Sequence, residues 1–204
     1  MSEQLRFDFG TTSLGTRPPS RGRTPVGKPD MLMFRLYPGQ DVPIASAVCR
    51  TRRAYGLTAK PYDADQRHVS LLSIGSYEGV TLQLIGDAAA AASQVRSPAF
   101  DLAFDRIVSF RNGRPKPLVM LCGEGANKVV ELVNRIAKAL NGFGFGVRLR
   151  SGFVPHCTVL RDDRLVPEVS LDRPIISSMR EFSLEHSTNG GRLRLRIGRW
   201  PLLG

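Results

Sequence analysis

The order of predicted strands and helices most constrains how this 204-residue chain can fold. Helical spacing of apolar residues predicts helices at 41–56 and 126–144. Alanine content predicts a helix at 79–96, although this stretch could instead hold a short strand and then a helix capped by Asp87. Apolar and alternating runs predict strands at 31–37, 68–74, 100–111, 116–123, 154–160, 176–187 and 192–200. Paired strands with interleaved helices favour an α+β fold, in which helices back the sheets.

The first 30 residues differ in composition from the rest of the chain. They are rich in Pro, Gly, Ser, Thr and Arg and contain few residues that could be buried. This composition predicts a flexible basic tail over 1–30, followed by one folded domain over 31–204.

Charge and cysteine content narrow the classes of function. The formal net charge of +11 favours a polyanionic partner, with nucleic acid or nucleotide ahead of an anionic membrane. The three cysteines, Cys49, Cys122 and Cys157, include no CxxC pair, which argues against a disulfide framework and a structural zinc site. With no apolar run of about 18 residues and no secretory signal, we expect a cytoplasmic protein that does not enter a membrane. We also expect it to be a monomer.

Two of the three histidines occur in the same local pattern. His68 precedes Ser70 by two residues in one predicted strand, and His156 precedes Thr158 by two residues in another. Residues i and i+2 of a strand point to the same face, about 6.5–7 Å apart, so each histidine shares a face with a hydroxyl group. Cys157 points to the other face, which predicts a core thiol rather than a Cys–His dyad.

If the two strands face each other, the four polar groups can bracket a phosphodiester. One neutral imidazole can take a proton from water while the other, as imidazolium, protonates the leaving oxygen. The two hydroxyl groups can donate hydrogen bonds to phosphate oxygens as negative charge develops. This chemistry needs no metal or cofactor, and no His, Asp or Glu pair in the sequence has metal-ligand spacing.

The two stretches RHVSLLSIG (67–75) and GFVPHCTVLRD (152–162) resemble a pair of known signatures. They are similar to the two HxTx motifs of the two-histidine (2H) phosphoesterase superfamily, and closest to its RNA 2′,3′-cyclic phosphodiesterase branch, the 2′-5′ RNA ligase family. The resemblance covers roughly residues 31–204. It implies two pseudo-symmetric αβ lobes with antiparallel sheets around a central cleft, with one HxTx motif in each lobe.

The resemblance also implies roles for individual residues. His68 would donate a proton to the leaving oxygen and His156 would accept a proton from water, while Ser70 and Thr158 would hold the phosphate. The product would be a 2′-phosphomonoester, and the same site run backward would ligate RNA through a 2′-5′ linkage.

Two further residues are candidates for substrate contacts. Arg161 matches the arginine of the second motif, but in a regular strand its odd separation from His156 puts it on the opposite face, so it reaches the phosphate only if the strand ends or bulges first. Phe153 could stack on a terminal base or line the site. In the first motif, serine replaces the usual threonine, and Leu72 and Ser73 replace the common Arg-Phe.

Two alternatives to hydrolysis of RNA ends remain open from the sequence. One is a phosphodiesterase that acts on a small cyclic nucleotide, and the other is a non-catalytic RNA-binding module that uses the basic surface. Turnover of a mononucleotide would favour the first. Salt-dependent binding that is insensitive to histidine substitution would favour the second.

Overall fold

The computed structural model describes residues 30–149, 151–188 and 193–203. Except for Asp30, the predicted tail over 1–30 lies outside these ranges. The described elements are β1 (Asp30–Leu36), α1 (Asp41–Tyr55), a 3₁₀ turn (Ala64–Gln66), β2 (Val69–Tyr77), α2 (Leu82–Ser93), β3 (Phe100–Ser109), β4 (Lys116–Cys122), α3 (Ala126–Gly142), β5 (His156–Asp162), β6 (Val169–Met179), β7 (Glu181–Thr188) and β8 (Leu193–Pro201).

The described strands form one eight-stranded sheet in the order β6-β3-β4-β5-β2-β1-β7-β8. We call β2, β1, β7 and β8 the first half-sheet, and β5, β4, β3 and β6 the second. All the strand pairs are antiparallel, and the half-sheets join through Val69 of β2, which pairs with Cys157 of β5. The predicted α+β fold with antiparallel strands is confirmed, and each half-sheet begins at the centre with one of the histidine motifs.

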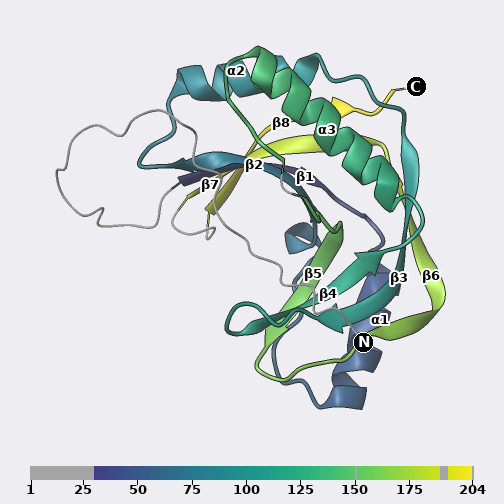
Figure 1. Ribbon diagram of the computed structural model, residues 1–204. Helices are drawn as coiled ribbons and strands as arrows, with labels where there is room; N and C mark the ends of the chain where they lie inside the picture. Colours follow the sequence, from purple (N-terminus) through teal and green to yellow (C-terminus); the bar gives the residue numbers. More distant parts are fainter. Residues whose placement is uncertain (1–29, 150, 189–192, 204) are drawn as a thin grey trace.

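Helices α1 and α3 connect the two half-sheets, whereas α2 packs on the half-sheet that it follows. Figure 1 shows α2 and α3 side by side over the sheet, where α2 contacts β8 and α3 contacts β2. Helix α1 follows β1 along the chain but contacts β6 of the second half-sheet. The apolar stripe of α3 that includes Val129, Leu132 and Ile136 is fully buried in the main hydrophobic core. Helices that follow one half-sheet and pack on the other hold the halves together.

Three sequence expectations differ from the structure in detail. The strand expected over 176–187 is two strands, β6 and β7, separated at Arg180. The strand expected to close at Gly75 continues to Tyr77, because Gly75 pairs with Leu32 of β1. The helix expected over 79–96 is confirmed as α2, and its cap is the Thr81 hydroxyl, which accepts from the Leu84 amide at 3.2 Å, rather than Asp87.

Candidate active site

The two histidine motifs lie beside each other at the junction of the half-sheets. Val69 and Cys157 form an antiparallel pair, and both side chains are fully buried in the core. Continuing that antiparallel register places His68 beside Thr158 and Ser70 beside His156. All four polar side chains therefore point away from the core, to the face that we call the inner face. The site expected from two distant sequence stretches is assembled by this register.

Both imidazole rings are held in the same way. Nδ1 of His68 lies 2.7 Å from the carbonyl oxygen of Gln66, and Nδ1 of His156 lies 2.8 Å from the carbonyl oxygen of Val154. A carbonyl oxygen only accepts hydrogen bonds, so each Nδ1 carries the proton and donates it. In the neutral rings Nε2 is then the basic nitrogen, which is the atom available for proton transfer.

The chain around each carbonyl is fixed by local structure. Gln66 ends the 3₁₀ turn, whose capping box with Asp63 includes a hydrogen bond from the Asp63 amide to Gln66 Oε1 at 3.1 Å. Val154 packs against a small hydrophobic cluster on the inner face, made of Phe110, Val119 and Leu121. Because both acceptors are anchored, the orientation of each imidazole ring is set before a ligand binds.

Each histidine also has an aromatic neighbour. The Phe110 ring meets the His156 ring edge to face at 4.9 Å between centroids, and the Tyr37 ring lies 6.2 Å from the His68 ring. Burial lowers the pKa of His156. The pKa of His68 is lowered to about 3, mainly by burial and then by the positive charge of Arg35. The charges of Arg194 and His156 lower it further, whereas the hydrogen bond to the Gln66 carbonyl raises it.

A β-bulge brings Arg161 to the inner face. Along β5, Thr158 pairs with Val119 and Leu160 pairs with Leu118, so Val159 is an extra residue without a partner on β4. The bulge changes the parity of the strand, and Arg161 pairs with Pro117 on the same face as His156. Its guanidinium Nη1 donates to the Pro115 carbonyl at 3.4 Å. The sequence predicted that Arg161 would reach this face only if the strand ended or bulged before it, and the strand does bulge.

The first half-sheet carries the same irregularity at the equivalent place. On β2, Ser70 pairs with Arg35 and Leu72 pairs with Phe34, which leaves Leu71 as the extra residue. Ser73, after this bulge, corresponds to Arg161 and pairs with Met33. The two half-sheets therefore share the histidine, the hydroxyl and the bulge. After the bulge, the second half-sheet has an arginine, Arg161, where the first has Ser73.

The remaining residues singled out from the sequence lie apart from this face or serve the core. Phe153 is half-buried and packs against the hydrophobic core. Cys157 is fully buried, which confirms the predicted core thiol, and burial raises its pKa to about 12. His186 Nε2 lies 3.1 Å from the Asp30 carboxylate.

A buried polar network beside His68 was not anticipated from the sequence. Arg35 Nη1 donates to Glu185 Oε2 at 2.6 Å, and both side chains are almost fully buried. The Tyr37 hydroxyl donates to the other carboxylate oxygen of Glu185, and Arg196 Nε lies 3.6 Å from the same oxygen. The signal in the sequence was a charged residue inside an otherwise apolar strand, Arg35 in MLMFRLY, but its partner could not be identified without the strand order β1-β7-β8.

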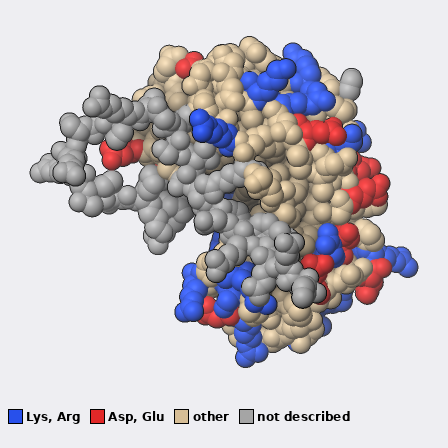
Figure 2. All heavy atoms as spheres, in the orientation of Figure 1, with Lys and Arg blue, Asp and Glu red and all other residues tan. Residues whose placement is uncertain are grey.

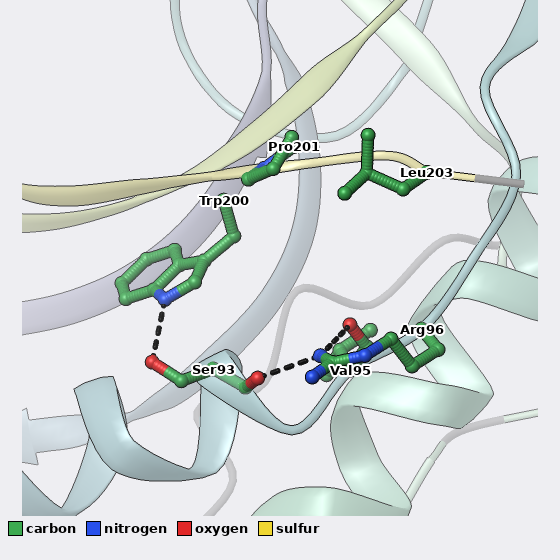
Figure 3. Close-up of a pocket in the computed structure, with 6 residues that line it drawn as sticks. All are labelled: Ser93, Val95, Arg96, Trp200, Pro201 and Leu203. Carbon is green, nitrogen blue, oxygen red and sulfur yellow. Dashed lines mark hydrogen bonds between the residues drawn. The ribbon is translucent and has the colours of Figure 1, made fainter.

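A separate pocket of about 270 Å³ lies on the core side of the sheet, near the end of α2 (Figure 3). It is lined by Ser93, Val95, Arg96, Trp200, Pro201 and Leu203. Trp200 Nε1 donates to Ser93 Oγ at 2.9 Å, and the Trp200 ring stacks on Phe182 of the core. This pocket therefore belongs to the face of the sheet opposite the histidines.

The described residues include neither a metal-binding cluster nor a membrane-spanning helix. No group of three or more His, Cys, Asp or Glu side chains in these ranges is placed to hold a metal ion. Among the same residues, no helix combines the length and the apolar character that crossing a membrane requires.

Several solved structures share this fold. LigT of E. coli in complex with 3′-AMP is 22% identical, with a TM-score of 0.67 over 86% of this chain and 99% of LigT. LigT in complex with ATP is 20% identical, with a TM-score of 0.65 over the same shares of the two chains. The protein TT0787 of Thermus thermophilus is 18% identical, with a TM-score of 0.64 over 85% of this chain and 98% of that protein.

Sequence comparison identifies the family. A comparison with curated protein sequences finds no match. The family model of the 2′-5′ RNA ligase superfamily, in contrast, matches residues 41–196, which include both histidine motifs, both bulges and seven of the eight described strands in whole or in part. The chain belongs to the 2′-5′ RNA ligase superfamily of 2H phosphoesterases.

Proposed function

We propose that this protein hydrolyses the 2′,3′-cyclic phosphate at the end of an RNA to a 2′-phosphomonoester, without a metal ion. The observation that carries the proposal is the pairing of Val69 with Cys157, whose antiparallel register sets His68 beside Thr158 and Ser70 beside His156, with both rings in the same tautomer. Two imidazoles and two hydroxyl groups on one face of the β2–β5 junction match the needs of a phosphodiester.

The reaction needs one base and one acid. Nε2 of His156 takes a proton from water as the water oxygen forms a bond to phosphorus. The bond from phosphorus to the 3′ oxygen breaks, and the proton on Nε2 of His68 passes to that oxygen. Ser70, Thr158 and Arg161 bind the non-bridging oxygens, where negative charge increases in the transition state. Exchange of protons with solvent then restores both rings.

The lowered pKa of His68 fits this role once the ligand is present. In the free protein His68 is neutral at pH 7, because its pKa is about 3. An anionic phosphate placed beside the ring favours the imidazolium form and raises that pKa. Binding of the substrate therefore favours protonation of His68, the proposed general acid.

Local charge supports an RNA substrate better than the overall charge does. On the face in Figure 2, lysine and arginine side chains form separate groups mixed with acidic side chains, so the net charge of +11 is not gathered into one surface there. Near the histidines, Arg35, Arg194 and Arg161 are all on the inner face. The same site run backward would join RNA ends through a 2′-5′ linkage.

Incubation with a labelled RNA oligonucleotide that ends in a 2′,3′-cyclic phosphate tests the proposal. The reaction contains EDTA, and the position of the phosphate in the product is determined by chromatography against 2′- and 3′-phosphate standards. We expect conversion to the 2′-phosphate at an unchanged rate with and without EDTA. Absence of turnover on this RNA would contradict the proposal, and turnover of a nucleoside 2′,3′-cyclic phosphate alone would identify a small cyclic nucleotide as the substrate instead.

A further inference from the structure

The inner face of the first half-sheet carries positive charge that the proposed reaction does not use. Arg194 and Arg196 of β8 pair with Ser187 and Glu185 of β7, and β7 pairs in turn with β1. These arginines therefore lie on the same face as Arg35 and on the same side of the sheet as His68. Arg35 and Arg196 contact one carboxylate, Glu185, and Arg194 adds a third guanidinium to this face, so the excess charge is positive.

The network around Glu185 fixes the position of Arg196. Glu185 is almost fully buried and already pairs with Arg35, so it binds Arg196 as a third neighbour beside Tyr37. The Arg196 guanidinium lies over the Tyr37 ring at 4.9 Å from its centroid. A guanidinium held against an aromatic ring loses less side-chain freedom when an anion binds.

Arg194 is exposed and has a different environment. Within the part of the chain that the structure describes, it has no ion pair with a carboxylate. Its charge nevertheless reaches the centre of the site, since it contributes to the lowered pKa of His68. An uncompensated guanidinium near a site for one phosphate is suited to a second anionic group of the same ligand.

The comparison of the half-sheets indicates where that second group lies. The second half-sheet has Arg161 after its bulge, whereas the first has the uncharged Ser73 at the equivalent position. Positive charge in the first half-sheet comes instead from β8, two strands beyond β1. Since strands are about 4.8 Å apart, this charge is offset from the reacting phosphate by more than one strand spacing.

We propose that Arg194 and Arg196 form a subsite for the backbone phosphate on the 5′ side of the terminal nucleotide, so that the site selects polynucleotide ends over mononucleotides. The proposal rests on the proposed function, in which His68 protonates the 3′ oxygen of the terminal ribose. That ribose then lies toward the first half-sheet, and the chain on its 5′ side runs over β1 and β7 toward β8. The Tyr37 ring is covered by Arg196, so this part of the face binds phosphate rather than a stacked base.

A kinetic comparison of two substrates tests the subsite. One is a trinucleotide that ends in a 2′,3′-cyclic phosphate, and the other is a nucleoside 2′,3′-cyclic phosphate without a 5′ phosphate. For Arg194→Gln, we expect the ratio of kcat/KM for the trinucleotide to kcat/KM for the mononucleotide to fall about tenfold or more, as for loss of a charge-assisted hydrogen bond. The control is Lys138→Gln, which removes the same charge from the exposed face of α3 and should leave the ratio unchanged.

Equilibrium binding separates failure of the subsite from failure of the proposed function. The probe is an RNA trinucleotide with a 3′-terminal phosphate. Its affinity for the wild-type protein, for Arg194→Gln and for Arg196→Gln is measured at several salt concentrations. Loss of one phosphate contact should reduce the slope of log K against log salt by about 0.7. Suppose that the wild type turns over both substrates, and that Arg194→Gln and Arg196→Gln change neither the kcat/KM ratio nor the salt slope. That result overturns the subsite and leaves the proposed function standing. With no turnover of either substrate, the proposed function fails and the slope decides whether the arginines bind RNA.

Discussion

Val69 lies directly opposite Cys157 across the junction of the two half-sheets, and this backbone pair sets the relative position of His68 and His156. The two buried side chains point into the core, while the histidines and hydroxyls beside them point to the inner face. One cross-strand contact thus places the two histidines and the two hydroxyl groups of the proposed site.

The fixed tautomers predict how asparagine behaves at the two histidines. In His68→Asn and His156→Asn the side-chain amide can still donate to the carbonyl of Gln66 or Val154, but no atom replaces Nε2. We expect kcat for hydrolysis of a cyclic phosphate to fall about 10²- to 10⁴-fold in each variant, as for loss of a general acid or base. The melting temperature should stay close to that of the wild type.

The double variant and a control complete this test. In the proposed reaction the two histidines act in one step, so the double variant should lose little more activity than either single variant. His186→Asn changes the third histidine, which pairs with Asp30, and should leave kcat within about twofold. Independent, multiplicative losses in the double variant would argue against a shared reaction step.

The low pKa of His68 predicts proton uptake when an anion binds. Above about pH 5 His68 is neutral in the free protein, and a bound anion favours its imidazolium form. Affinity for sulfate, which does not titrate in this range, should therefore rise as the pH falls from about 8 to 5. Calorimetry in buffers of different ionisation enthalpy measures the protons taken up, and the His68→Asn variant should take up fewer. Affinity that is equal across this range would contradict the prediction.

The bulge at Val159 predicts that Arg161 acts on the phosphate. In Arg161→Gln we expect kcat/KM for a nucleoside 2′,3′-cyclic phosphate to fall about 10- to 100-fold, because a charge-assisted hydrogen bond to the substrate is lost. Arg161→Lys should recover part of the activity, since lysine keeps the charge but not the planar fork. Arg164→Gln, an exposed arginine three residues along the chain, is the control, and equal effects at the two positions would remove the special role of Arg161.

Asp162 predicts a pH-dependent contribution to stability. Its carboxylate accepts hydrogen bonds from the amides of Thr58, Ala59 and Arg164 at 2.9–3.0 Å, and the Arg164 amide is the largest cause of its lowered pKa. A lowered pKa means that the folded state binds the proton less well than the unfolded state. The stabilisation is therefore present above about pH 4, the ordinary range of the group, and is lost as the pH falls through the lowered pKa.

Asp162→Asn should lower the free energy of unfolding by about 1–3 kcal/mol at pH 7, and the difference from the wild type should shrink below about pH 4. Urea denaturation at a series of pH values measures both effects. The control is Asp163→Asn, whose exposed side chain belongs to the neighbouring residue. A constant difference between wild type and Asp162→Asn down to low pH would show that the amide contacts do not depend on the charge.

The parity of strands explains how much of this site could be predicted from the sequence. The period of two placed Ser70 with His68 and separated Cys157 from His156, and both placements hold because these residues precede the bulges. Beyond the bulges the rule fails, as Arg161 illustrates. A bulge depends on how a strand pairs with its neighbour, and the pattern of VLRD alone does not contain that information.

The limits of the fold prediction have similar causes. The stretch 176–187 was interpreted as one strand, although its alternation changes phase between Met179 and Phe182, where β6 ends and β7 begins. In 192–200 arginines alternate with apolar residues, a pattern that by itself is typical of a strand with one solvated face, and the sequence does not reveal that β8 pairs with β7, and β7 with β1. Only this strand order brings Arg196 over Tyr37.

The junction between β2 and β5 also determines what the smallest working unit of this protein is. Each half-sheet contributes one imidazole and one hydroxyl, and each is crossed by a helix that follows the other along the chain. A fragment that contained only the first half-sheet would have the proposed acid, His68, without the proposed base, His156. A fragment of the second half-sheet would have His156 without His68. The proposed activity therefore requires both half-sheets, joined where Val69 pairs with Cys157.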